Sequence, residues 1–268
     1  MAEEFRTIDV SRDGAVGIVT LYSEPGRGHG GFNSTHAEVG RALDVMRYDN
    51  SIRVAVITGE KDVFYRSPPG RPRMDKRDPH DDWDLTQGMQ KTYNTLIEME
   101  KPVIAKVNGL CGSFGLSLVF ACDFIVARED AVFGDPHIAM GEGGIVPMGR
   151  PDSGVVPGDG STVFVPLHMP PPLAREFLWL ARQFTGREMA EMRCINHAVP
   201  NDKLDETVKK MADALLRRPA YALALSKRAF NKFVVERFNS TYDLAWSYEA
   251  LNFYQYGRYD KDRGEFNL

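Results

Sequence analysis

The sequence predicts an α/β fold in which parallel strands are covered by helices and are followed by a helical C-terminal region. Short apolar segments such as residues 54–58 and 103–107 alternate with amphipathic helical patterns. The strand, helix, strand unit recurs about every 50 residues, which is typical of parallel strands joined by right-handed crossovers. From residue 172 onward the pattern indicates helices only. We therefore expect a core over residues 1–171 and a helical region over 172–268.

The first third of the chain begins with a hairpin. Residues 7–22 form two apolar runs that meet at Asp13-Gly14, a strong hairpin turn signal. Ser34 is a suitable N-cap for a helix, and residues 54–58 then form a short apolar strand of the kind that is covered on both sides. A polar, proline-rich loop is expected over residues 60–82. The apolar face of the first helix comprises Val39, Ala42, Leu43 and Met46.

The remaining elements alternate strands with helices and then become helical. A second helix should end near Lys101, because Pro102 disfavours helical geometry in the residue before it. Strands are expected at 103–107, 124–127 and 131–133. The predicted C-terminal helices are 172–182, 186–193, 204–217, 220–237 and 240–256.

Composition excludes several classes of protein. The 268 residues carry a net charge of −4 without a long basic run, so nucleic acid is not an expected partner. No stretch of apolar residues is long enough to cross a membrane, and the acidic first residues do not resemble a signal peptide. We expect a cytoplasmic protein. The three cysteines are widely spaced and indicate reduced thiols, with no metal site.

A loop rich in glycine and proline, residues 133–160, contains two candidate catalytic groups. His137 follows a predicted strand, and Asp159 lies between two glycines. Histidine is the side chain most easily poised for proton transfer near neutral pH, and catalytic groups concentrate on loops. The same residues are also compatible with a surface histidine and a simple Asp-Gly turn. The local sequence leaves both interpretations open.

Glu249 is a carboxylate inside an aromatic stripe. Tyr242, Trp246, Glu249 and Phe253 share one face of a predicted helix. A buried acid in apolar surroundings is a recurrent catalytic device. The alternative is a glutamate at the margin of the buried face that reaches water.

The segment Gly26-Arg-Gly-His-Gly-Gly31 matches the dinucleotide fingerprint only nominally. In that fingerprint the glycines end the strand and open the helix, whereas here three residues precede the motif and the helix starts after Asn33. A flexible loop at the rim of a site is the favoured interpretation, and no nicotinamide cofactor is expected.

The order of these segments is similar to the enoyl-CoA hydratase/isomerase, or crotonase, superfamily. VAVITG (54–59), KPVIAKVNG (101–109), ACDFIVAREDAVFGDP (121–136) and the helices after Pro172 carry the resemblance. It implies a spiral of repeated strand-strand-helix turns, and a C-terminal region that forms a homotrimer or a dimer of trimers. It also implies an enolate, commonly of a CoA thioester, that two backbone N–H groups stabilise.

The usual hydratase residues are replaced in this sequence. The glycine segment that supplies one oxyanion donor corresponds to Ser113-Phe114-Gly115, and the two catalytic glutamates correspond to Ser117 and His137. The second oxyanion donor falls at Pro68, and proline has no N–H to donate. Water addition by a pair of glutamates is therefore not expected.

The altered residues resemble one branch, the 6-oxocamphor hydrolase and related β-diketone hydrolases, more closely than they resemble the superfamily at large. The shared stretches are FNSTHAEV (32–39), PHDDWD (79–84), GVVPGDG (154–160) and YEAL (248–251). This resemblance implies that His137 is the catalytic histidine, with Asp159 as its partner, Glu249 as the helical acid and Phe32 as a pocket wall. The chain departs from the branch at Phe114, where a second histidine is expected, and at residues 141–153, which look like an insertion.

We therefore expect a cofactor-free hydrolase that cleaves a C–C bond in a small β-diketone, cyclic or open-chain, by retro-Claisen chemistry. His137, oriented by Asp159, would activate water and later return the proton to the enolate. Two alternatives are a divergent enzyme of acyl-CoA thioesters and a non-catalytic binding protein of the same fold. The residues expected to bind substrate are Phe32, Trp83, Phe114 and Pro68.

Overall fold

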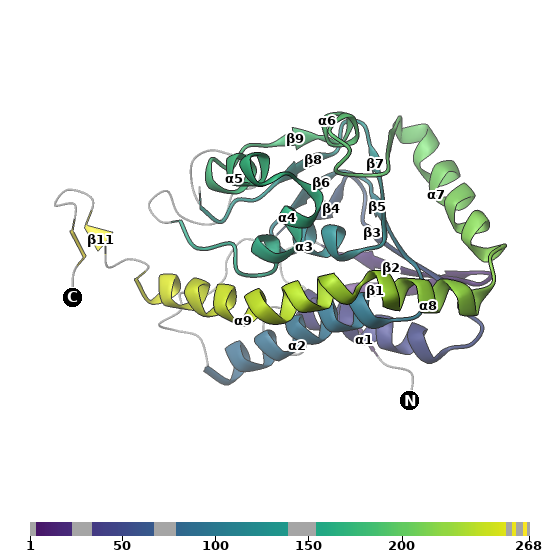
Figure 1. The fold of residues 1–268 in the computed structure, drawn as a ribbon, viewed down its shortest axis with the longest axis horizontal. Coiled ribbons are helices and arrows are strands. Elements are labelled where there is room, and N and C mark those ends of the chain that lie inside the picture. The colour runs from purple at the N-terminus through teal and green to yellow at the C-terminus, as the bar shows by residue number, and fades with distance from the viewer. Residues whose placement is uncertain are drawn as a thin grey trace.

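The computed structural model describes residues 4–22, 34–66, 79–138, 154–255, 259–260 and 265–266 (Figure 1). Its main sheet has the strand order β1-β2-β3-β5-β7-β10. β1 and β2 form the predicted antiparallel hairpin, and every later neighbour is parallel. The strands are β1 (Ile8–Asp13), β2 (Val16–Leu21), β3 (Val54–Gly59), β5 (Val103–Val107), β7 (Phe124–Arg128) and β10 (His197–Val199).

A second sheet makes the chain a spiral. Each of β3, β5 and β7 is followed directly by a short strand of this sheet, whose order is β4-β6-β8-β9. The expected repeat of strand-strand-helix turns is thereby confirmed, and each turn places the end of a short strand near the same edge. The members are β4 (Val63–Tyr65), β6 (Leu110–Gly112), β8 (Val132–Gly134) and β9 (Phe184–Thr185).

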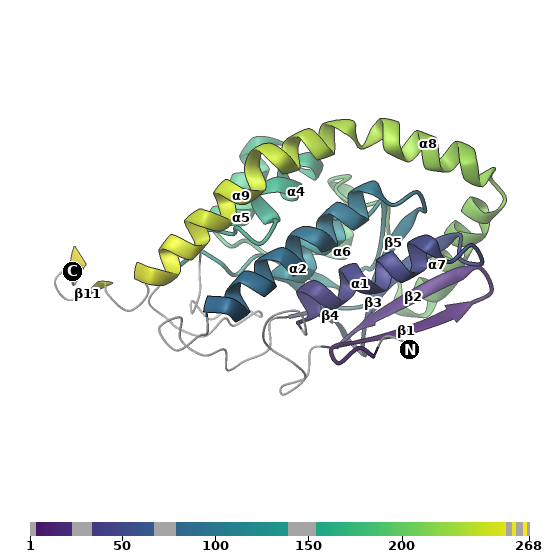
Figure 2. The same ribbon diagram turned by 90° about the horizontal axis from the view of Figure 1, so that it is seen from below.

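Helices cover both faces of the main sheet because its central strands are apolar on both sides. One face packs on α7, whose Leu204 and Val208 contact Val56 and its neighbours. The other face packs on α1, which lies beside α2 in Figure 2. The helices are α1 (Thr35–Tyr48), α2 (Pro79–Glu98), α3 (Phe114–Ala121), α4 (Ser161–His168), α5 (Pro171–Trp179), α6 (Gly186–Glu191), α7 (Asn201–Leu216), α8 (Ala220–Phe230) and α9 (Lys232–Gln255).

The C-terminal region differs from the prediction in two respects. It is not helical throughout, because β9 and β10 pair with β8 and β7, and β11 (Tyr259–Asp260) pairs with β12 (Glu265–Phe266). Strands of two or three residues are too short to show a period of two. The break between the last helices lies at Asn231, so the residues around Phe238 are helical. A domain boundary near residue 171 stays a prediction.

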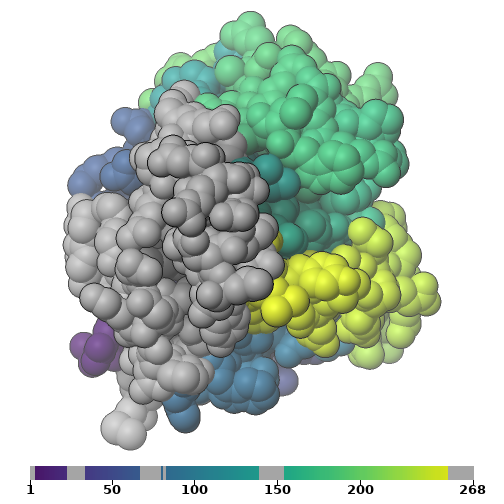
Figure 3. Space-filling model, turned by 90° about the vertical axis from the view of Figure 1, so that its left-hand side faces the viewer, coloured from purple at the N-terminus to yellow at the C-terminus, as the bar shows by residue number. Residues whose placement is uncertain are grey.

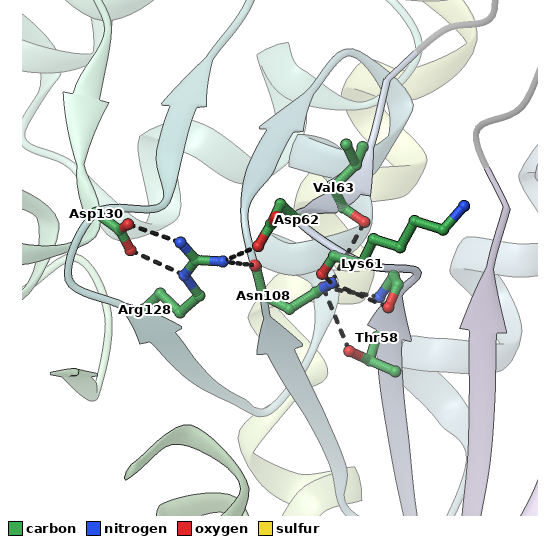
Figure 4. A network of polar contacts seen from close by, with 8 residues as sticks. Thr58, Lys61, Asp62, Val63, Asn108, Arg128 and Asp130 are labelled. Carbon is green, nitrogen blue, oxygen red and sulfur yellow. Dashed lines mark hydrogen bonds and ion pairs between the residues drawn. The ribbon is translucent and has the colours of Figure 1, made fainter. Parts of the chain in front are cut away.

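A polar network fixes the turns after β3 and β5 (Figure 4). The Asn108 amide donates to the carbonyls of Gly59 and Lys61 at 3.0 and 2.6 Å, and the Gly59 N–H donates back to Asn108 Oδ1 at 3.0 Å. Arg128, at the end of β7, donates to the Asn108 carbonyl at 3.1 Å and to the side chains of Asp62 and Asp130.

No helix among the described residues is both long enough and apolar enough to cross a membrane.

Candidate active site

Four titratable side chains converge below the surface at the end of the second sheet. Asp135 and His137 follow β8, Asp159 precedes α4, and Glu249 comes from the last third of α9. All four are buried, with exposed fractions of 1, 2, 4 and 3% respectively. The structure therefore brings together the three residues that the sequence predicted as catalytic, and adds a fourth.

The imidazole of His137 lies between carboxylates on both sides. Its Nδ1 is 2.6 Å from Asp135 Oδ1, and the same oxygen accepts the His137 backbone N–H at 2.9 Å. Its Nε2 faces Asp159 Oδ2 at 3.4 Å and Glu249 Oε1 at 3.9 Å. The Nδ1 contact is a hydrogen bond, whereas the Nε2 contacts are longer than good hydrogen bonds.

This geometry corrects the expected role of Asp159. The residue that orients the imidazole is Asp135, because its carboxylate holds Nδ1, while Asp159 lies on the opposite, Nε2 side. The sequence analysis did not predict a role for Asp135. Its signal was the Asp-Pro-His spacing, since an aspartate side chain commonly accepts the N–H of the residue two positions later.

The charges around the imidazole set three pKa values in different directions. Burial lowers the pKa of His137, but the charges of Asp135, Asp159 and Glu249 outweigh burial and raise it to about 10. Burial raises the pKa of Asp135, but the charge and hydrogen bonds of His137 leave it below its usual value. For Asp159, burial and the charge of Asp135 outweigh the attraction of His137, so its pKa is raised. The two aspartates are thus not equivalent.

Asp159 is positioned by its own surroundings rather than by a simple turn. Ser117 Oγ donates to Asp159 Oδ1 at 3.1 Å and lies 3.0 Å from Ser161 Oγ. Tyr93 Oη donates to the Asp159 backbone carbonyl at 2.5 Å. Ser117, which stands where the family resemblance places a glutamate, therefore binds an acid that arrives from another loop.

The glycines beside Asp159 are required by close packing. A Cβ on Gly158 would lie 2.4 Å from the Ala245 carbonyl oxygen, and one on Gly160, with φ +131°, would lie 2.8 Å from Tyr93 Oη. Because backbone and buried rings cannot move away, this segment needs glycine at both positions. The glycines let the loop press between α9 and α2, and so place Asp159 beside Glu249.

The residues that α9 buries differ in part from the predicted stripe. Phe238, Tyr242, Ala245 and Glu249 are buried, whereas Trp246 is only partly buried. Glu249 thus belongs to the buried face and does not lie at its margin. The side chain of Phe253 lies outside the described residues.

The N-terminus of α3 has a strained backbone beside this cluster. Ser113 has φ 54° and ψ −137°, a conformation that favours glycine. Phe114, the next residue, is fully buried, with its ring centroid 4.1 Å from that of His36 and 5.6 Å from that of Tyr65. Phe114 is therefore part of the aromatic core next to the site, and its contact with substrate stays a prediction.

Of the other predicted binding residues, Trp83 alone belongs to the part of the chain that the structure describes. Trp83 lies near the start of α2 with 63% of its surface exposed, and its contact with substrate stays a prediction. Phe32 and Pro68 lie outside the described residues, as do the glycine loop 26–31 and the segment 141–153.

The described residues include no cluster of three or more side chains arranged to hold a metal ion. Cys111, Cys122 and Cys194 are free and buried, as the sequence predicted.

The fold and the site together define a member of a large enzyme family. The sequence profile described as enoyl-CoA hydratase/isomerase matches residues 32–261, and the chain belongs to this family.

Two named relatives act on CoA thioesters. A crotonyl-CoA hydratase from Syntrophomonas wolfei is 29% identical over 216 residues, which cover 81% of this chain and 76% of the relative. A carnitinyl-CoA dehydratase from Salmonella typhimurium is 28% identical over 196 residues, which cover 73% of this chain and 70% of the relative.

Two solved structures share the fold. An enoyl-CoA hydratase/isomerase from Mycobacterium paratuberculosis superposes with a TM-score of 0.77 at 27% identity, covering 92% of this chain and 94% of its own. A β-diketone hydrolase from the cyanobacterium Anabaena, bound to (S)-3-oxocyclohexyl acetic acid, also has a TM-score of 0.77, at 22% identity over 93% of this chain and 94% of its own. At that identity the second likeness shows the fold alone.

Proposed function

We propose that this chain is a cofactor-free hydrolase that cleaves the C–C bond between the two carbonyls of a small β-diketone. The observation that carries the proposal is the buried imidazole of His137, held at Nδ1 by Asp135 and facing two carboxylates through Nε2. A histidine held at one nitrogen by a carboxylate is the arrangement of a general base.

Because the pKa of His137 is raised to about 10, the imidazole must release a proton within the cluster before it can act as a base. At neutral pH the imidazole carries a proton on Nε2, which is 3.4 Å from Asp159 Oδ2. Transfer of this proton to Asp159, whose pKa is also raised, leaves a neutral imidazole and a protonated acid. The site then contains a base and an acid side by side.

The hydrolysis uses both groups. His137 Nε2 takes a proton from water while the water oxygen bonds to one carbonyl carbon, whose oxygen becomes an oxyanion. The oxyanion re-forms its C=O bond, the C–C bond breaks, and its electron pair becomes the enolate of the second carbonyl. Protonated Asp159 gives its proton to the enolate carbon, and the imidazolium then returns a proton to Asp159. The products are a carboxylic acid and a ketone.

Glu249 completes the site at the Nε2 side. Its Oε1 is 3.9 Å from His137 Nε2, so a water molecule near that nitrogen can contact both groups. We assign Glu249 to holding the attacking water, and its carboxylate also favours the imidazolium that forms during attack. Phe114 and Phe32 remain the proposed apolar walls, and small dicarbonyls are the proposed substrates.

A second candidate, an enzyme of acyl-CoA thioesters, is favoured by the relatives. The crotonyl-CoA hydratase and the carnitinyl-CoA dehydratase each cover more than 70% of this chain. In that case the Asp135 and His137 pair would act as base on a thioester substrate. CoA or acyl-CoA would then raise the melting temperature, because a ligand that binds only the folded state stabilises it.

The test is turnover of a panel of cyclic 1,3-diketones in ¹⁸O-labelled water, beside a panel of acyl-CoA thioesters. The proposal predicts ring opening to a keto acid with one ¹⁸O atom in the new carboxylate, and no stabilisation by CoA. Turnover of thioesters alone would select the second candidate. Inactivity on both panels, with a stable protein partner, would leave the non-catalytic interpretation.

The homotrimeric or hexameric assembly is also a proposal. α8 contains no buried residue although it is rich in alanine and leucine. On α9, which reaches the surface in Figure 3, Leu244, Tyr248 and Leu251 are exposed by 52, 51 and 58%. Exposed apolar faces of this kind support contact with further copies. Light scattering after size-exclusion chromatography should give three or six times the monomer mass.

A further inference from the structure

Two buried tyrosines beside the site differ in how their hydroxyls are satisfied. Tyr93 and Tyr242 are at most 1% exposed, and their rings meet edge to face with centroids 5.7 Å apart. Tyr93 Oη donates to the Asp159 carbonyl at 2.5 Å. Tyr242 Oη has no hydrogen-bond partner among the residues that the structure describes. A buried hydroxyl without a partner is costly, so a structure that keeps one needs a reason.

Tyr242 lies on the same buried face of α9 as Glu249, two helical turns before it. The loop that carries Asp159 presses on this face, because Gly158 packs directly against Ala245 and Glu249. Burial, followed by the charges of Asp159 and Glu249, raises the pKa of Tyr242 well above its usual value. The hydroxyl therefore keeps its proton and is a neutral donor close to both carboxylates.

The ring of Tyr242 is held in place by its neighbours. Phe238, one turn earlier on α9, stacks on it with centroids 4.6 Å apart and an interplanar angle of 21°. The ring of Tyr93 packs edge to face against the ring of Tyr242. Because the ring cannot turn without disturbing this packing, the position of the hydroxyl oxygen is fixed before any ligand binds, as electrostatic stabilisation of a transition state requires.

We propose that Tyr242 is a further catalytic residue, whose hydroxyl donates a hydrogen bond to the substrate carbonyl oxygen that becomes the oxyanion. The inference rests on the proposed function. Negative charge that develops beside the carboxylates of Asp135 and Glu249 needs a hydrogen-bond donor, and both His137 and the protonated Asp159 are occupied with proton transfer. At Pro68, where the family resemblance places a second backbone donor, no N–H exists.

The experiment compares Tyr242→Phe with the matched control Tyr93→Phe, because each removes one buried hydroxyl from neighbouring rings. Tyr242→Phe should lower kcat for diketone cleavage by about 10²-fold, the size of effect seen for a lost oxyanion donor, with little change in KM. Its melting temperature should be unchanged or higher, because an unsatisfied hydroxyl is removed. Tyr93→Phe should lower the melting temperature and lower kcat less.

A second readout does not depend on turnover. A ¹³C-labelled cyclic monoketone lacks the second carbonyl and cannot be cleaved, so its carbonyl stretch reports the donor directly. Binding to the wild-type protein should lower the stretching frequency, and binding to Tyr242→Phe should abolish most of that downshift.

Three results would overturn the inference. The first is an active wild type whose kcat is unchanged in Tyr242→Phe, which would leave the proposed function intact. The second is an equal carbonyl shift in both proteins. The third is a wild type that cleaves no diketone, which would remove the proposed function and this inference together.

Discussion

Two polar clusters at neighbouring strand ends differ in how their charges are paired. In the network of Asn108 and Arg128, donors meet acceptors: the guanidinium lies between Asp62 and Asp130, and the amide bridges two turns. In the cluster of His137, one imidazole is surrounded by three buried carboxylates. The first cluster has no proton to exchange and fixes the scaffold. The second brings a titratable imidazole within 4 Å of three buried carboxylates, and it is where we propose that the chemistry takes place.

The largest expected effect is the loss of activity in His137→Gln. Removing a general base typically costs 10²–10⁴-fold, and we expect a fall in kcat for diketone cleavage of about 10³-fold. His168→Gln is the control, because His168 is also partly covered but its ring nitrogens face the backbone carbonyls of Phe120 and Cys194, away from the cluster residues. Steady-state kinetics of both variants check this. A similar loss in His168→Gln would remove the distinction between the two histidines.

The next effect separates the two aspartates that flank the imidazole. Asp135→Asn should lower both kcat, by about 10²-fold, and the free energy of unfolding at neutral pH, because the lowered pKa of Asp135 shows that folding favours its charge. Asp159→Asn should lower kcat but keep or raise stability, because the raised pKa of Asp159 shows that folding disfavours its charge. Urea unfolding and kinetics on the two variants measure both quantities. Equal stability losses would contradict the assignment.

In the cluster of Asn108 and Arg128, a substitution should lower stability more than activity. Asn108→Ala leaves the carbonyls of Gly59 and Lys61 without their donor, and we expect about 2 kcal/mol lower unfolding free energy. The value of kcat should change less than tenfold, since Asn108 donates no proton to the reaction. Urea unfolding beside single-turnover kinetics tests this. A selective loss of kcat with unchanged stability would show that the network takes part in the chemistry.

A further effect is in the pH dependence of stability. The folded-state pKa of His137 is about 10, above its usual 6.5, so the charged imidazole stabilises the folded protein. This contribution is complete below pH 6.5 and is lost as pH rises toward 10. The stability difference between wild type and His137→Gln should therefore shrink over that window. A difference that stays constant from pH 6 to pH 10 would show that folding does not shift the pKa of His137, and would contradict the account.

Much of the fold follows from the sequence because its elements have strong local signals. β3 is an apolar run, the first turn is Asp13-Gly14, and Pro102 follows α2. β9 and β10 could not be predicted, because strands this short are defined by their partners. The helix break at Asn231 was also missed, since neither glycine nor proline marks it.

The site was predictable only in part. A histidine, an aspartate and a glutamate far apart in the sequence could be placed together through the family resemblance, not through any spacing. The order of the cluster depends on three-dimensional contacts: which carboxylate holds Nδ1, and how Ser117 and Tyr93 hold the loop of Asp159. Tyr242 is an ordinary core aromatic in the sequence, and only its hydroxyl in the folded structure distinguishes it.

The central claim is that His137 and Asp135 act as one unit in diketone hydrolysis. A double-mutant cycle on kcat/KM tests it most directly, with His137→Gln, Asp135→Asn and the double variant measured on one cyclic diketone. The account predicts that the double variant is no slower than His137→Gln alone, because Asp135 acts only through the imidazole. Losses that multiply would show that the two residues act independently, and would contradict the account.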